Sequence, residues 1–137
     1  GIFEGENIKT PSRCVVEDYV ASSRWAKKIG GLKALRARAD ANAKLLNDWI
    51  WERTFATNLA KEPETRSNTS LCFTLAGDEV VPKKMAKLLE AEKVALDIGG
   101  YRDAPPGLRV WCGATVETSD LKALLPWLDW AYAQATA

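Results

Sequence analysis

The 137-residue sequence contains no histidine. Histidine is the commonest general base and metal ligand, and it activates many serine and cysteine nucleophiles. Its absence excludes Ser-His and Cys-His catalytic pairs. The three cysteines, Cys14, Cys72 and Cys112, are widely spaced and form no Cys-x-x-Cys pair, so neither a disulfide framework nor a metal site is predicted. We expect reduced, mostly buried thiols.

The sequence also lacks an excess of charge and a long apolar run. Nineteen Lys and Arg residues face 18 Asp and Glu residues, so we expect neither a nucleic acid nor an anionic membrane as partner. No apolar run approaches the roughly 20 residues that span a bilayer, and the amino terminus lacks the features of a signal peptide. We therefore expect a cytoplasmic protein.

The amino-terminal part predicts a linker and two helices. Residues 1–9 show no periodicity and are typical of a linker. A helix is predicted over 10–29, because Thr10 suits the N-cap and Pro11 suits the first helical position. A second, amphipathic helix is predicted over 32–51.

The carboxy-terminal part alternates predicted strands and helices. In the last strand, alternation places Arg109 on the opposite face from Leu108 and Val110. The fold class is therefore α+β, with about three strands covered by helices and a helical segment before them. We divide the chain into a linker and first helix (1–30) and a small α+β domain (31–137). The predicted strands cover 69–75, 93–98 and 108–116; helices begin at Val81 and at Thr118 or Ser119, and Pro126 predicts a kink or break near residue 122.

Two arginines flank the turn in YRDAPPGLRV, residues 101–110. A guanidinium at the start of a strand, next to a Pro-Pro-Gly turn, can present a planar fork to a carboxylate or phosphate. The alternative is that Arg102 and Arg109 are surface residues that pair with Asp103 or Asp97. The spacing does not decide between the two interpretations.

Thr10 and Pro11 at a helix start also have two interpretations. Ordinary capping is one. The other is an anion site, because free backbone N–H groups and the helix dipole both favour a phosphate. Lys9 beside them would strengthen such a site or would be a solvated side chain.

Several strings together resemble one enzyme family. They are EGENIKTPSRCVVEDY, GGLKALRARADANAK, ETRSNTS and GGYRDAPPGLRVWCGATVETSDLKALLPWLDWAYA. Over nearly its whole length the chain resembles the carboxy-terminal portion of bacterial phosphoserine aminotransferases. These are homodimeric fold-type I transaminases that depend on pyridoxal phosphate. They exchange an amino group between glutamate and 3-phosphohydroxypyruvate in serine biosynthesis.

The resemblance implies a role in binding rather than in bond chemistry. It makes Arg109 the ligand of the substrate α-carboxylate and Arg102 a ligand of the substrate phosphate. Thr10 would help to hold the cofactor phosphate of the neighbouring subunit. The implied partners are a large pyridoxal-phosphate-binding domain, a second subunit and a small phosphorylated amino or keto acid, with residues 1–30 at the interface between domains or subunits.

The chain departs from the family pattern at positions that matter for binding. Lys9 replaces the asparagine that usually precedes Thr10. Gly99, Gly100 and Tyr101 supply no counterpart to the histidine that often precedes Arg102. The family's aldimine lysine has no counterpart in the sequence, so the resemblance implies no catalytic residue, and the chain alone should bind no cofactor and be inactive.

Two alternatives stay open. One is a non-enzymatic stand-alone or engineered interaction or structural module on the same fold. The other is a weak anion-binding domain that uses Lys9, Thr10 and Arg102 for phosphate compounds.

Overall fold

The computed structural model describes residues 12–137, and the chain divides into two compact units, Gly1–Leu35 and Arg36–Ala137. The division falls inside helix α2, Gly31–Trp51. Each unit is described by itself below. The predicted linker (1–9) and Thr10 lie outside the described residues.

The first unit contains helix α1, Arg13–Lys28, which has no buried residue. The helix predicted over 10–29 is present but begins later: its N-cap is Ser12, with extended backbone and no side-chain capping bond, so the N-cap predicted at Thr10 is wrong. Lys27 and Lys28 occupy its last turn, where positive charge interacts favourably with the helix dipole. Gly30 follows at φ +116°, a left-handed conformation that a residue without Cβ adopts readily. The chain thus leaves α1 and enters α2 after a two-residue break.

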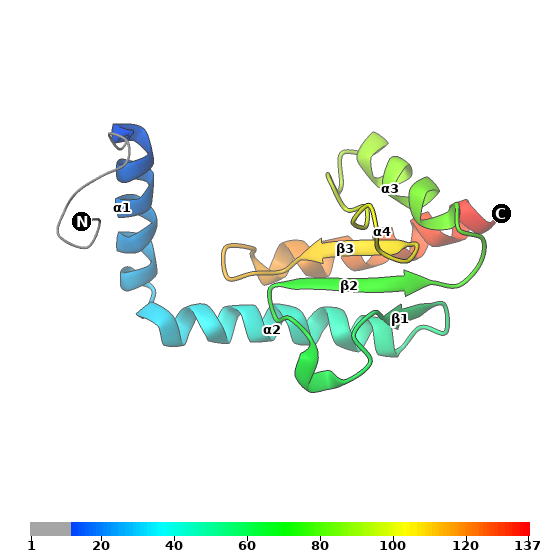
Figure 1. Ribbon diagram of the computed structural model, residues 1–137, viewed down its shortest axis with the longest axis horizontal. Helices are drawn as coiled ribbons and strands as arrows, with labels where there is room; N and C mark the ends of the chain where they lie inside the picture. Colours follow the sequence, from blue (N-terminus) through cyan, green and yellow to red (C-terminus); the bar gives the residue numbers. More distant parts are fainter. Residues whose placement is uncertain (1–11) are drawn as a thin grey trace. The chain divides into compact units, whose positions relative to one another are not determined.

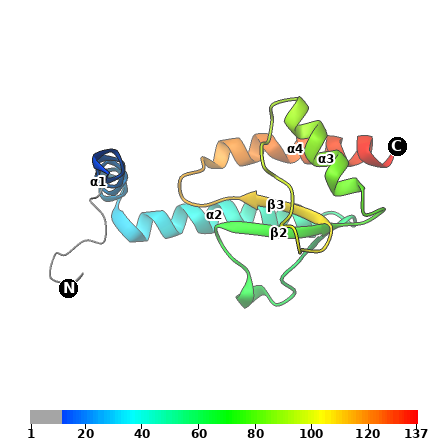
Figure 2. The same cartoon turned by 45° about the horizontal axis from the view of Figure 1, so that its top comes forward.

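The second unit is built on a sheet of three antiparallel strands in the order β1-β2-β3, the strands found within residues 12–137 (Figure 1). The α+β prediction is thus confirmed. Helix α2 enters this unit, and α3 and α4 pack side by side (Figures 1 and 2). The remaining elements are β1 Ala56–Asn58, the short 3-10 helix η2 Pro63–Thr65, β2 Ser70–Leu75, α3 Val81–Ala91, β3 Gly107–Trp111 and α4 Thr118–Thr136.

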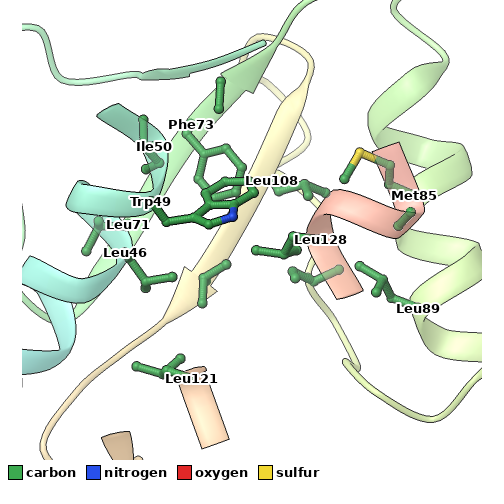
Figure 3. Packing of buried hydrophobic residues seen from close by; sticks show 14 of the residues in the cluster. Leu46, Trp49, Ile50, Leu71, Phe73, Met85, Leu89, Leu108, Leu121 and Leu128 are labelled. Carbon is green, nitrogen blue, oxygen red and sulfur yellow. The ribbon is translucent and has the colours of Figure 1, made fainter. Parts of the chain in front are cut away.

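One face of the sheet packs against the helices. Phe73 of β2 and Leu108 of β3 are paired in register and are both almost completely buried. The ring of Trp49 from α2 meets Phe73 edge to face, with 5.8 Å between the ring centroids. Figure 3 shows these side chains together, with Leu128 of α4 beside them and Met85 of α3 beyond. The second unit therefore has one continuous apolar core, and the sheet's other face carries Arg109.

A buried asparagine ties the loop before α4 to α2. The Asn42 amide donates to the Val116 carbonyl at 2.9 Å and, more weakly, to the Gly113 carbonyl at 3.4 Å. Its oxygen accepts from the Thr118 hydroxyl at 2.7 Å. The predicted N-cap at Thr118 or Ser119 is wrong: Thr118 is the first helical residue, and Glu117 is the N-cap, without a side-chain capping bond.

The strand predicted over 93–98 is wrong. Lys93 and Asp97 both have positive φ, at +58° and +52°, and such residues interrupt an extended strand. The segment reaches the sheet only through an isolated bridge between Gly99 and Leu108. The third strand is instead β1, which is the next element after α2.

Two other boundaries differ from the prediction. The strand predicted over 108–116 ends at Trp111, because a turn begins at Gly113. A Cβ on Gly113 would lie 2.5 Å from the Trp111 ring, so this turn folds tightly against the indole. Helix α4 runs without a break through Pro126, which is exposed; a break near residue 122 is therefore wrong.

Candidate functional site

Arg109 projects from β3 on the side of the sheet opposite the core. It is paired in register with Cys72 of β2, between the buried neighbours Leu108 and Val110. The alternation predicted from the sequence is therefore confirmed. About 26 % of the Arg109 side chain is accessible to solvent, so the side chain is partly buried.

Two neighbours hold the Arg109 guanidinium. Its Nη2 donates to Oδ2 of Asp97 at 3.0 Å, which is the surface ion pair considered in the sequence analysis. The guanidinium carbon lies 4.7 Å from the centroid of the Tyr101 ring, within the range of a cation–π contact. The Arg109 Nε is buried and has no hydrogen-bond partner. Any donor of this guanidinium that a ligand can reach must therefore lie at its Nη end.

Arg109 carries a positive charge at physiological pH, as arginine does in proteins generally. Partial burial disfavours its charged form, but the phenol of Tyr101 and the carboxylate of Asp97 outweigh that effect, and the pKa of Arg109 is raised above its ordinary value. A permanently charged fork is what recognition of a carboxylate or phosphate requires.

The backbone that carries Asp97 and Tyr101 is bound to β3. The Arg109 N–H donates to the Ile98 carbonyl at 2.9 Å. A Cβ on Gly100 would lie 3.3 Å from the Gly107 carbonyl oxygen, so the two backbones pass each other closely. The residues that contact the guanidinium are therefore placed by main-chain contacts with the same strand.

A surface cavity of about 240 Å³ adjoins this cluster. Arg109 and Asp97 contribute its charged side chains, and Trp111 and the start of α4 contribute apolar walls. This volume lies just below the roughly 300–1,000 Å³ that is typical of small-molecule sites. A charged fork beside an apolar wall can orient a small anion.

The other residues predicted for the site are not joined to this cluster. Arg102 is exposed, and none of the hydrogen bonds or ion pairs among residues 12–137 links it to Arg109 or to Asp103. Thr10 lies outside the described residues. Tyr101 was not predicted as part of the site; its signal in the sequence is an aromatic residue next to one of the two arginines.

A larger hollow, of about 550 Å³, lies between the end of α2 and β1. Its lining includes Trp51, which is 90 % exposed, and Arg53 and Arg66. Both arginines are engaged: Arg53 binds Asp129 at 2.8 Å, and the Arg66 Nε donates to the Ala60 carbonyl at 3.0 Å. These contacts use part of the hydrogen-bonding capacity of both guanidinium groups that line this hollow.

No group of three or more His, Cys, Asp or Glu side chains between residues 12 and 137 could hold a metal ion. In the same part of the chain no helix is long and apolar enough to cross a membrane.

Comparison with solved structures defines the fold. The phosphoserine aminotransferase from Bacillus circulans subsp. alkalophilus superposes with a TM-score of 0.71 at 24 % identity, over 81 % of this chain and 30 % of that one. Another structure, which describes the Schiff base in a phosphoserine aminotransferase, superposes with a TM-score of 0.68, also at 24 % identity. The α+β unit thus has the architecture of the carboxy-terminal region of a fold-type I aminotransferase.

Comparison of sequences identifies relatives among the phosphoserine aminotransferases. The phosphoserine aminotransferases of Methanosarcina mazei and Methanosarcina barkeri are each 47 % identical to the chain over 131 residues, which is 96 % of this chain and 35 % of theirs. No family model matches the chain. The chain is homologous to the carboxy-terminal part of phosphoserine aminotransferase, and it spans about a third of the length of these relatives.

Proposed function

We propose that the chain is the substrate-recognition part of a phosphoserine aminotransferase-like protein. The reaction would be amino transfer between glutamate and 3-phosphohydroxypyruvate, as in serine biosynthesis. The observation that carries the proposal is the Arg109 guanidinium, which is fixed on the sheet by Tyr101 and Asp97 at the wall of a small cavity. Similarity to two phosphoserine aminotransferases over 96 % of the chain supports this ligand class.

In this proposal Arg109 binds the α-carboxylate of the substrate. Its two Nη atoms would form charge-assisted bonds to the carboxylate, and the rigid strand would set the orientation of the bound molecule. Arg102, which is exposed, would reach the substrate phosphate. The cavity wall formed by Trp111 and α4 would exclude water from one side of the ligand.

The described residues do not fit pyridoxal phosphate by themselves. When bound, this cofactor stabilises carbanions, and it is carried by a lysine in a protected pocket. All ten lysines between residues 12 and 137 are solvent exposed. We therefore propose that the cofactor belongs to a larger pyridoxal-phosphate-binding portion, that Thr10 contacts its phosphate from a second subunit, and that this chain alone is inactive.

The domain division is part of the same proposal. Residues 1–30 would lie at the interface between domains or subunits, and 31–137 would form the recognition domain. The exposure of Val15 and Tyr19 on α1, at 65 % and 74 %, supports an interface role, because apolar side chains on one helix favour coverage by a partner.

A chimeric enzyme tests the proposal. The chain replaces the homologous third of the Methanosarcina mazei enzyme, and amino transfer from glutamate to 3-phosphohydroxypyruvate is measured by steady-state kinetics. We expect an active chimera in which Arg109→Lys raises KM about tenfold or more and lowers kcat, because an ammonium cannot reproduce the planar fork. Arg36→Lys, a substitution of the same type at an exposed position on α2, should leave both constants unchanged.

The outcomes separate the alternatives. Unchanged kinetics for Arg109→Lys in an active chimera would contradict the assignment of the carboxylate site. A chimera that folds and binds pyridoxal phosphate but transfers no amino group would favour the non-enzymatic module instead.

A further inference from the structure

Asp97 places a carboxylate where an incoming carboxylate would bind. Its Oδ2 accepts from the Arg109 Nη2 at 3.0 Å, at the Nη end of the fork. The Arg109 Nε is buried, so a ligand cannot use the other edge of the guanidinium without moving the side chain. A ligand carboxylate that binds both Nη atoms must therefore share Nη2 with Asp97 or displace it.

The Asp97 side chain is free to leave. It is 91 % exposed, and its contact with Arg109 is a single hydrogen-bonded ion pair. Exposed ion pairs of this kind are weak, so displacement should cost a ligand only a small factor in affinity, roughly two- to fivefold. The guanidinium would keep its place during the exchange, because the Tyr101 ring remains against it.

The backbone holds Asp97 at this position although the side chain is exposed. Asp97 has φ +52°, a conformation that few residues other than Gly, Asn and Asp adopt easily. The next residue, Ile98, accepts a hydrogen bond from the Arg109 N–H at 2.9 Å. Arg109 is therefore bound to this loop twice, by its side chain to Asp97 and by its backbone N–H to Ile98.

We infer that Asp97 is an internal competitor that occupies the Arg109 fork when no ligand is bound and is displaced by the ligand carboxylate. This inference rests on the proposed function only in naming that ligand as the substrate's α-carboxylate. Competition by Asp97 would lower the affinity of the Arg109 guanidinium for a carboxylate. It would likewise lower its affinity for other small anions.

The test uses the chain itself, with acetate as the carboxylate probe. The Nε–H signal of Arg109 is followed by NMR, because burial of this atom slows its exchange with water. Acetate replaces chloride at constant ionic strength, so that general screening stays the same. The absence of the signal in Arg109→Lys assigns it.

Two variants remove the competing carboxylate and keep a residue that tolerates the positive φ at this position. Asp97→Asn keeps the size and tolerates positive φ, and Asp97→Gly removes the side chain altogether. In both we expect acetate to half-saturate the Arg109 response at a concentration roughly two- to fivefold lower than in the unmodified chain. Glu90→Gln, which removes one exposed carboxylate from α3, should leave the midpoint unchanged.

Each other result overturns the inference. A higher acetate midpoint in Asp97→Asn would make Asp97 a positioning residue, and an equal midpoint would show that it does not compete. No response of Arg109 to acetate in any of the proteins would show that the fork is closed to carboxylates. The chimera's kinetics do not enter this test, so the proposed function and this inference can fail separately.

Discussion

At the scale of single residues, burial determines the chemistry of Cys112. Its side chain is completely inaccessible to solvent, and its thiol lies 3.7 Å from the Asn68 carbonyl oxygen. Loss of hydration disfavours the thiolate and raises the pKa of Cys112 from 9.0 to about 11. Cys112 should therefore be a poor nucleophile, whereas Cys14 is exposed.

The Cys112 pKa predicts a loss of stability at alkaline pH. Between pH 9 and 11 the unfolded chain releases the thiol proton while the folded chain retains it, so the free energy of unfolding falls as the pH rises. The contribution should be fully present below pH 9 and should decrease by about 2–3 kcal/mol by pH 11. Urea denaturation of the unmodified chain and of Cys112→Ala across this range measures it.

The alanine variant serves as the control for every other group that titrates in the same interval. The difference in unfolding free energy between the two proteins should shrink towards pH 11. A difference that stays constant with pH would show that Cys112 has an ordinary pKa in the folded state.

Arg109 shows what a residue type can and cannot indicate. Its place on the outward face of a strand followed from alternation with Leu108 and Val110, and the structure confirms it. Asp97 is one of the two acidic residues that the sequence offers as ion-pair partners. The contact with Tyr101 was not predicted. Both contacts depend on a loop with a positive φ at Asp97, which no apolar pattern encodes.

At the scale of elements, the approach of β3 to β2 depends on Gly107. A Cβ at this position would lie 2.2 Å from the Phe73 carbonyl oxygen, which is backbone and cannot turn aside. The pairing of Gly107 with Thr74 ends the β2–β3 ladder, next to the turn that precedes Arg109. A side chain here would separate the strands where the candidate site begins.

Gly107→Ala should therefore destabilise the chain by roughly 2–4 kcal/mol, measured as the free energy of unfolding in urea. Gly99→Ala is the matched control, because nothing lies within 4 Å of a Cβ at Gly99 and its φ is not positive. The control should change stability by no more than about 1 kcal/mol. Equal losses in the two variants would contradict the close approach of the strands.

The helices were more predictable than the strands. Long amphipathic repeats determined α2 and the start of α3 at Val81, because periodicity accumulates over many residues. Short strands carry less signal: β1 has three residues and was missed, while 93–98 has the composition of a strand and is a loop. Whether each of these two segments forms a strand depends on the strands available to pair with it, rather than on its local sequence preference.

At the scale of the whole molecule, the two compact units should differ in stability. Helix α1 has no buried residue, whereas α2 contributes Leu46 and Trp49 to the core of the second unit. Most of the free energy of folding comes from burial of apolar surface. The α+β unit should therefore fold without the preceding segment.

A chain that begins at Gly31 tests this expectation. Its urea midpoint and its free energy of unfolding should agree with those of the complete chain within about 0.5 kcal/mol, because the removed residues 13–28 bury no side chain. Thermal unfolding followed by circular dichroism provides a second measurement. A loss of more than about 1 kcal/mol would show that residues 1–30 stabilise the second unit.

The sequence by itself determined the fold class, the long helices, the outward face of Arg109 and the resemblance to phosphoserine aminotransferases. These properties rest on local periodicity and residue type, which a single chain displays directly. Only the tertiary structure decided which segment became the third strand, which residues hold the Arg109 guanidinium, and that Asn42 engages the hydroxyl expected to cap α4. Those outcomes depend on contacts between residues distant in sequence, where backbone and side-chain groups compete for the same partners.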